Sequence, residues 1–414
     1  MMFQLLLILL GGVLASAAEP DSLGLAEAEK LALEADPTTR ALLARSSASQ
    51  EAAVAAGQLP DPKLKLAALA LPVDTFDLDQ EPMTQLQFGV VQQFPPGRTL
   101  DLQQRQMSSR AESFGDRAQA RRLEVLRAVR LTLSEVAAEV EMRDILAASR
   151  DVLVELHGLI EDYYGTGRAE QQQVYRAALE ASRVEERLAA VAQAEAEARA
   201  RLSMWIGEAA YRPLADTWPP MEEPAAAARI LADLPDHPVL LAQDHEIEAA
   251  ETAVDIANQQ YKPGFSVEVS YGDRNGRDLT GRDLPDFVSA MVMVDLPVFR
   301  DKRQDRRLAA SRDELDAALE GRLEILRMLR RDVNESAARL RQVRERLERF
   351  REILLPQAAD NREAALDAYR TAVGDLTELM RAQITEYELK LEYARLKRDE
   401  LKARAQLLYL EGRS

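Results

Sequence analysis

The chain has 414 residues, with 70 acidic and 53 basic side chains and a formal net charge of −17. Such a polyanion repels nucleic-acid phosphates, which argues against a nucleic-acid partner. The absence of cysteine excludes disulfides, thiolate metal sites and cysteine nucleophiles, and three histidines leave little for imidazole chemistry. Length alone predicts two or three domains, but an apolar fraction rich in Ala and Leu, with 5% aromatics, favours long solvated helices over a thick core.

The N-terminus predicts a secretory signal peptide over residues 1–17. Met1 to Leu14 is apolar apart from Gln4, and the small residues Ala15-Ser16-Ala17 follow as a cleavage site. Because the segment carries no Lys or Arg, a short buried helix is the alternative. Downstream, no apolar run approaches the ~18 residues of a transmembrane helix, so we expect an exported chain without a helical anchor.

Landmarks along the chain predict an internal duplication, with repeats over 18–207 and 233–414 and a loop-rich insert over 208–232. Each repeat has a helix, a strand pair, long helices, a glycine turn and a closing glycine in the same order. A coincidental placement of proline and glycine residues explains this order poorly. The paired landmarks are Asp36-Pro37 and Asp236-His237-Pro238, Pro60 and Pro263, Pro95-Pro96 and Pro297, Gly167 and Gly374, and Gly207 and Gly412.

Strands are expected at about 63–73, 83–94, 264–272 and 286–299, because apolar and polar residues alternate there with period two. This pattern is typical of a membrane-spanning barrel strand, apolar toward lipid and polar toward the lumen. A half-buried soluble sheet alternates in the same way. If these strands span a membrane, they must pair with strands of other copies, because a closed barrel takes about eight strands and open edges are not tolerated in hydrocarbon.

The helices are expected to be very long. No proline interrupts Thr99 to Tyr164, a length that allows a rod of about 100 Å. The segment from Arg300 to Val373 repeats this pattern, with Gly321 and Pro356 as interruptions, and Pro356 is expected to kink or break the helix. Shorter return helices are expected over 168–205 and 375–410. Rods of this length must pack side by side.

Together these features resemble the TolC-like outer-membrane efflux protein family. The most specific match is the tip and return segment, with Tyr164, Gly167 and Arg168 followed by the run Gln171-Gln172-Gln173. A glycine followed by such a run is most similar to the CzcC/CusC-like branch, which serves heavy-metal efflux and resistance. The second repeat matches through Tyr369 and Gly374, although its tyrosine precedes the glycine by five residues instead of the usual three.

The resemblance implies a mainly α fold with a small β part, and a homotrimer. Each chain would contribute four strands to a shared outer-membrane β-barrel, and its duplicated helical hairpins would form an α-barrel tunnel through the periplasm. Family members are passive exit ducts, neither enzymes nor cofactor binders. Their partners are outer-membrane lipid, a periplasmic adaptor and an inner-membrane pump.

The resemblance also places a channel gate near the second tip, where family members carry acidic rings. Glu378 retains the acidic character of the first ring position, whereas Arg381 reverses that of the second. A ring of carboxylates favours cations, but a solvated helical Glu is the common alternative. Arg381 is expected to pair with Glu378 at i,i+3. Asp375 is either part of the gate or a carboxylate at the start of its helix that interacts favourably with the helix dipole.

No metal site is expected. Met291, Met293 and Met380 form no cluster with ligand spacing, so packing explains them better than soft-metal binding. His237 and His245 are eight residues apart, which favours a solvated helix face. Two alternative functions remain open: a periplasmic adaptor or a structural coiled-coil protein of an envelope transport complex. No catalytic constellation supports an enzyme.

Overall fold

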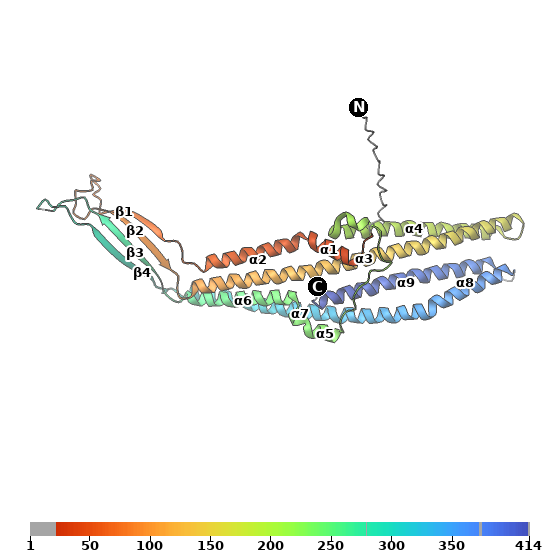
Figure 1. Ribbon diagram of the computed structural model, residues 1–414. Helices are drawn as coiled ribbons and strands as arrows, with labels where there is room; N and C mark the ends of the chain where they lie inside the picture. Colours follow the sequence, from red (N-terminus) through yellow and green to blue (C-terminus); the bar gives the residue numbers. More distant parts are fainter. Residues whose placement is uncertain (1–21, 279, 372–374, 413–414) are drawn as a thin grey trace, which may run out of the picture.

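The computed structural model describes residues 22–278, 280–371 and 375–412. The predicted signal peptide over 1–17 and the tip glycine Gly374 lie outside these residues. The molecule is elongated, with a small sheet at one end, long helices extending away from it and two helical hairpins turning at the opposite end (Figure 1). None of the described helices is both long and apolar enough to cross a bilayer.

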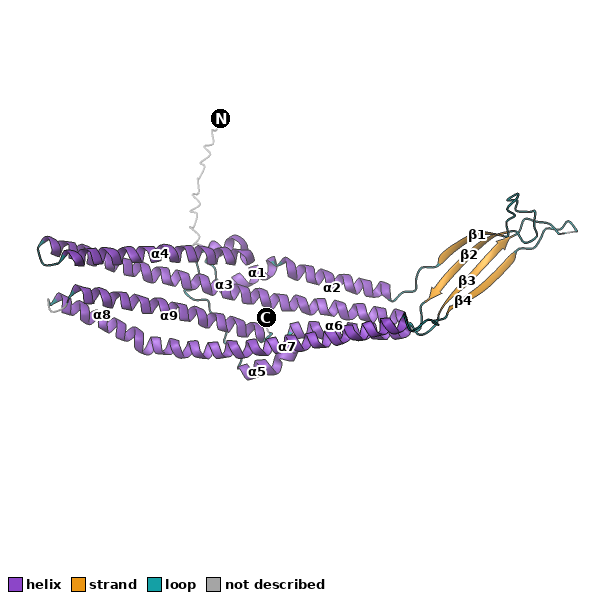
Figure 2. Cartoon of the chain, turned by 180° about the vertical axis from the view of Figure 1, so that it is seen from behind, coloured by secondary structure: helices purple, strands orange, loops and turns teal. Residues whose placement is uncertain are grey.

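The half of the helical body next to the sheet contains α2 (Pro37–Ala56), α3 (Thr99–Gly165), α6 (Pro238–Gln259) and α7 (Gln304–Arg349). The half toward the tips contains α4 (Gln171–Ile206) and α9 (Leu376–Leu410), which run beside the end of α3, and α8 (Leu355–Arg370), which runs beside α9 (Figure 2). The short helices α1 (Leu25–Ala35) and α5 (Ala227–Asp233) lie near the middle. The molecule is therefore mainly α, as expected.

Proline controls where the second long helix breaks. α3 runs unbroken for 67 residues, and Gly321 does not interrupt α7. A π-helical turn over Phe350–Leu354 separates α7 from α8, directly before Pro356 in the first turn of α8. Because proline has no backbone N–H, the wider turn accommodates the missing donor, and the expected break is found at Pro356.

The four strands form one antiparallel sheet in the order β1-β2-β3-β4. They are β1 (Lys63–Leu69), β2 (Gln85–Phe94), β3 (Gly264–Asp273) and β4 (Phe287–Asp295). β1 and β4 are shorter than the expected 63–73 and 286–299. Ala70 adopts a φ of 53°, which takes the chain out of the extended conformation, and Pro297 cannot donate a ladder hydrogen bond after β4. The β2·β3 pairing joins the two repeats.

Burial is spread along the shaft in several small clusters. One lies at the tips and includes Leu153, Ile160 and Met380, and another joins α1, α3 and α4 through Leu25, Val129 and Leu202. The insert over 208–232 is not wholly loop, because it contains a 3-10 turn over Gly207–Tyr211 and the beginning of α5. The long helices bury their apolar residues in narrow contacts with neighbouring helices and form no single thick core, as the composition indicates.

Candidate functional site

One face of the sheet is apolar and exposed across all four strands. The register aligns Val90 with Leu64 on one side and Val269 on the other, and Val269 with Ala290. The same face carries Leu66, Ala68, Leu86, Phe88, Phe94, Phe265, Val267, Tyr271, Val288, Val292 and Val294, with Gln92 and Asp273 as its polar members. Val90 is 50% exposed and Val292 is 63% exposed. An exposed apolar patch of this extent marks a surface that binds lipid or protein.

The opposite face of the sheet is mixed, with paired polar side chains beside the apolar Val91, Phe287, Met291 and Met293. The Lys65 Nζ atom lies 2.7 Å from the Glu268 Oε1 atom, and the Gln87 side-chain amide donates a 2.7 Å hydrogen bond to the Ser270 hydroxyl. These two contacts connect β1 to β3 and β2 to β3 on one surface. Apolar residues on one face and hydrogen-bonded polar residues on the other are the arrangement of a barrel strand between lipid and an aqueous lumen.

The first hairpin tip is organised by backbone geometry at Gly167. This residue has a φ of 74°, and its N–H donates to the Tyr164 carbonyl at 3.0 Å. The N–H of Arg168 donates to the Tyr163 carbonyl at 2.7 Å, which completes a Schellman motif at the end of α3. Glu170 then begins α4 with a capping box, in which its N–H donates to the Gln173 Oε1 atom at 2.9 Å.

Side chains connect the two hairpin tips directly. The Gln173 Nε2 atom donates to the Asp375 Oδ1 atom at 3.2 Å, and the same oxygen caps α9 by accepting from the Thr377 N–H at 3.3 Å. The rings of Tyr163 and Tyr369 lie 6.2 Å apart between centroids. Burial, together with the neighbouring Tyr163, raises the pKa of Tyr369 to about 12. Asp375 thus has a capping role at this joint.

Tyr369 and Asp375 were expected at the tip from the sequence, but the particular pairs that they form were not. Their partners, Tyr163 and Gln173, come from the first hairpin, and no spacing along the chain specifies either pair. Tyr164, 47% exposed, and Arg168 are both exposed, and neither takes part in the contacts that join the two tips. Met380 is 5% exposed and packs in the tip cluster, in agreement with the packing interpretation of that methionine.

Glu378 and Arg381 lie in the first turns of α9, close to the tip. The Glu378 Oε1 atom is 2.7 Å from an Arg381 guanidinium nitrogen, and both side chains are more than half exposed. The expected i,i+3 pair therefore forms. Within one chain the carboxylate is neutralised locally and faces solvent.

The two histidines at positions 237 and 245 differ from the expected solvated face. His237 is 2% exposed and caps α6, because its Nδ1 atom accepts from the Val239 N–H at 3.3 Å. The His245 Nδ1 atom lies 3.1 Å from the Glu112 Oε2 atom, and its Nε2 atom lies 3.4 Å from the Asp116 Oδ2 atom. The spacing of residues within α6 does not reveal these contacts, since both carboxylates come from α3.

Solved structures of several bacterial channels share this architecture. CusC, described as forming a transmembrane channel, is 12% identical over 95% of this chain and 92% of its own, with a TM-score of 0.75. The outer membrane protein VceC of Vibrio cholerae is 16% identical over 94% and 96%, with a TM-score of 0.76. The Campylobacter jejuni outer membrane channel CmeC is 11% identical over 94% and 85%, with a TM-score of 0.77.

These likenesses show the fold. The chain has the fold of TolC-like outer-membrane channels, which confirms at that level the resemblance found in the sequence. No protein-family model matches the sequence, and no curated protein matches it.

Proposed function

We propose that the chain forms the outer-membrane channel of a tripartite efflux system, an exit duct that conducts substrates passively and catalyses no reaction. The observation that carries this proposal is the sheet at one end of the helical body, with an exposed, mainly apolar face and an opposite face that holds an ion pair and a hydrogen bond between polar side chains. A lipid-facing barrel wall requires both. The likeness to CusC, VceC and CmeC supports the same class of protein.

Self-assembly follows from the edges of the sheet. β1 and β4 are its outer strands, and each has one neighbouring strand in the described chain. In hydrocarbon an open edge would leave backbone N–H and C=O groups without partners, at a cost of several kcal/mol each. A homotrimer in outer-membrane lipid, with β4 of one copy beside β1 of the next, closes the barrel. The helices then continue it as a periplasmic α-barrel.

The tips complete the proposal at the periplasmic end. Glu378, Arg381 and Asp375 are assigned to a constriction there, with Tyr164, Gly167, Arg168 and Tyr369 shaping the hairpin ends, where a periplasmic adaptor and an inner-membrane pump would dock. Metal cations are the proposed substrate class, supported by the likeness of the Gln171–Gln173 run to the heavy-metal branch. The signal peptide over 1–17 would direct export.

The alternative function is a periplasmic adaptor or a structural coiled-coil protein. An adaptor typically has one helical hairpin flanked by small β-modules, whereas this chain has two hairpins and a continuous four-stranded sheet. A water-soluble protein of either kind would also need to cover the apolar face, because exposed patches of this extent promote aggregation.

Membrane fractionation tests the proposed function. We expect the mature protein to remain in the membrane pellet after salt and alkaline carbonate washes and to dissolve only with detergent. In detergent it should migrate as a trimer that dissociates on heating. Reconstitution into a planar bilayer should produce steady conductance. Extraction by carbonate alone, or the absence of conductance from a folded trimer, would contradict the channel.

A further inference from the structure

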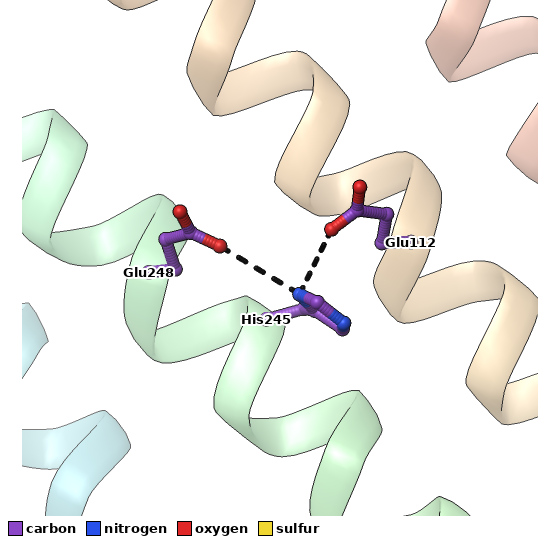
Figure 3. Close-up of side chains that lie close together, drawn as sticks. All are labelled: Glu112, His245 and Glu248. Carbon is purple, nitrogen blue, oxygen red and sulfur yellow. Dashed lines mark ion pairs between the residues drawn. The ribbon is translucent and has the colours of Figure 1, made fainter.

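A polar cluster lies between α3 and α6 in the half of the shaft nearest the sheet. Figure 3 shows the Nδ1 atom of His245 facing two carboxylates, Glu112 from α3 and Glu248 from α6. Its distance is 3.1 Å to the Glu112 Oε2 atom and 3.7 Å to the Glu248 Oε2 atom. One nitrogen and two oxygens from two helices therefore converge on one point.

These separations suit a shared metal ion. The three ligand atoms all lie within 4.8 Å of one another. Around a tetrahedral Zn²⁺ with bonds of roughly 2.1 Å, neighbouring ligand atoms are about 3.4 Å apart. The observed 3.1 and 3.7 Å lie on either side of that value.

The surroundings orient the ligands. The other imidazole nitrogen, Nε2, lies 3.4 Å from the Asp116 Oδ2 atom, and a carboxylate at this position is the usual partner of a metal-binding histidine. Arg105 contacts the Oε1 atom of Glu248 at 2.8 Å, which leaves the Oε2 atom for the cluster.

We propose that Glu112, His245 and Glu248 bind a divalent transition-metal cation of the Zn²⁺ type, and that Asp116 positions the imidazole. One nitrogen and carboxylate oxygens suit such a cation, whereas soft monovalent copper or silver prefers sulfur ligands. The site has three carboxylates, from Glu112, Asp116 and Glu248, and one guanidinium group, from Arg105, so its net charge is negative. The bound ion joins α3 of the first repeat to α6 of the second, and this role is independent of channel conduction.

Zinc titration of the full chain in detergent, after removal of metal with chelator, tests the site by calorimetry. We expect one Zn²⁺ per chain and a thermal transition that rises with zinc. His245→Gln and Glu112→Gln should each weaken binding by more than about tenfold, and Asp116→Asn by about tenfold. Glu112 is largely exposed, so its variant is expected to fold normally.

His157→Gln is the matched control, because His157 is a partly exposed helical histidine that faces one carboxylate, Glu161, at 3.8 Å. Its zinc affinity should equal that of the wild type. Failure of the wild-type chain to bind Zn²⁺, or equal affinity in wild type and His245→Gln, would overturn the proposal and leave His245 as an ion-pair partner only. The readout requires no conductance, so it does not depend on whether the channel proposal holds.

Discussion

At the residue scale, the two repeats begin corresponding helices with different chemistry. Asp36 caps α2 by accepting from the Thr39 N–H at 2.7 Å, and it also pairs with Arg121 of α3 at 3.1 Å. Burial raises the pKa of Asp36, but the hydrogen bonds from Arg121 and Thr39 outweigh it, so the pKa is lowered overall. In the second repeat the capping group is the imidazole of His237, one position beyond Asp236.

His237 makes stability depend on pH. Its Nδ1 atom accepts from a backbone N–H and its Nε2 atom faces the Tyr409 carbonyl at 3.1 Å, so the folded chain holds a neutral imidazole with the proton on Nε2. Burial lowers its pKa from the ordinary 6.5. At pH values well above 6.5 the imidazole is neutral in both the folded and the unfolded chain, so the full contribution of His237 to stability is present. As the pH falls below 6.5, the unfolded chain binds the proton more readily, and stability is lost through the folded pKa.

We therefore expect His237→Asn to reduce the loss of thermal stability between about pH 7.5 and about pH 5.5, because asparagine keeps an oxygen acceptor for the Val239 N–H but does not titrate there. Circular dichroism of the helical signal at both pH values measures the difference. His157→Asn serves as the control and should leave the wild-type pH dependence intact. An equal loss in His237→Asn and wild type would show that His237 does not carry the effect.

At the scale of the element, turn geometry at the first tip decides how α3 returns as α4. Gly167 needs a left-handed backbone, and alanine there costs about 1–2 kcal/mol, although the added methyl group would meet no atom within 4 Å. Gly165, two residues earlier, is helical, so alanine there should stabilise the last turn by about 0.5 kcal/mol. The two glycine variants should therefore shift stability in opposite directions.

Amide hydrogen exchange in the last turn of α3 measures both variants locally. Faster exchange is expected in Gly167→Ala, and equal or slower exchange in Gly165→Ala. If both variants exchanged alike, the conformation of Gly167 would not be what limits this turn.

The sheet offers a second test at this scale through neighbouring residues of β4. Val292 lies on the apolar face, whereas Met291 lies on the opposite, mixed face, where it is paired with Glu268. If the apolar face contacts lipid, Val292→Lys should cost about 2–4 kcal/mol, whereas Met291→Lys places its ammonium in the lumen near a carboxylate. The carbonate-resistant, heat-labile trimer should decrease with Val292→Lys and persist with Met291→Lys. Equal behaviour of the two variants would contradict the assignment of the faces.

At the scale of the whole molecule, local patterns predicted more than distant contacts. Period-two alternation located the four strands, and the absence of proline located α3. Each of these patterns depends only on residues within a single strand or helix, so it can be recognised in the sequence. Strand ends were less well predicted, since the left-handed conformation of Ala70 has no signal in its side chain. The length-based expectation of two or three domains did not anticipate a shaft in which burial is divided among seams.

Contacts between repeats were the part that the sequence could not provide. Gln173 reaches Asp375 because the two hairpin tips meet, and Glu112 faces His245 because α3 packs against α6. Neither pair has a characteristic spacing along the chain. Both the joint at the tips and the candidate metal site depend on this arrangement, so they could be found only after the helices were placed in space.

If the proposed trimer forms, the arrangement of its copies around the channel axis determines what the pair of Glu378 and Arg381 does. In the proposed trimer, three such pairs would surround the constriction, each nearly neutral because the charges lie 2.7 Å apart. Glu378→Gln would release three guanidinium groups and shift the reversal potential of the channel toward anions. Arg381→Gln would release three carboxylates and shift it toward cations.

Bilayer recordings under a salt gradient measure these opposite shifts. Glu335→Gln is the matched control, because Glu335 pairs with Arg339 on α7 with similar exposure, and the whole of α8 separates α7 from the second tip. It should leave the reversal potential unchanged. Unchanged potentials in both tip variants would remove Glu378 and Arg381 from the conduction path. Opposite shifts would instead mean that ion selectivity is set by the balance within each pair, so that a single charge substitution near the tip is enough to reverse it.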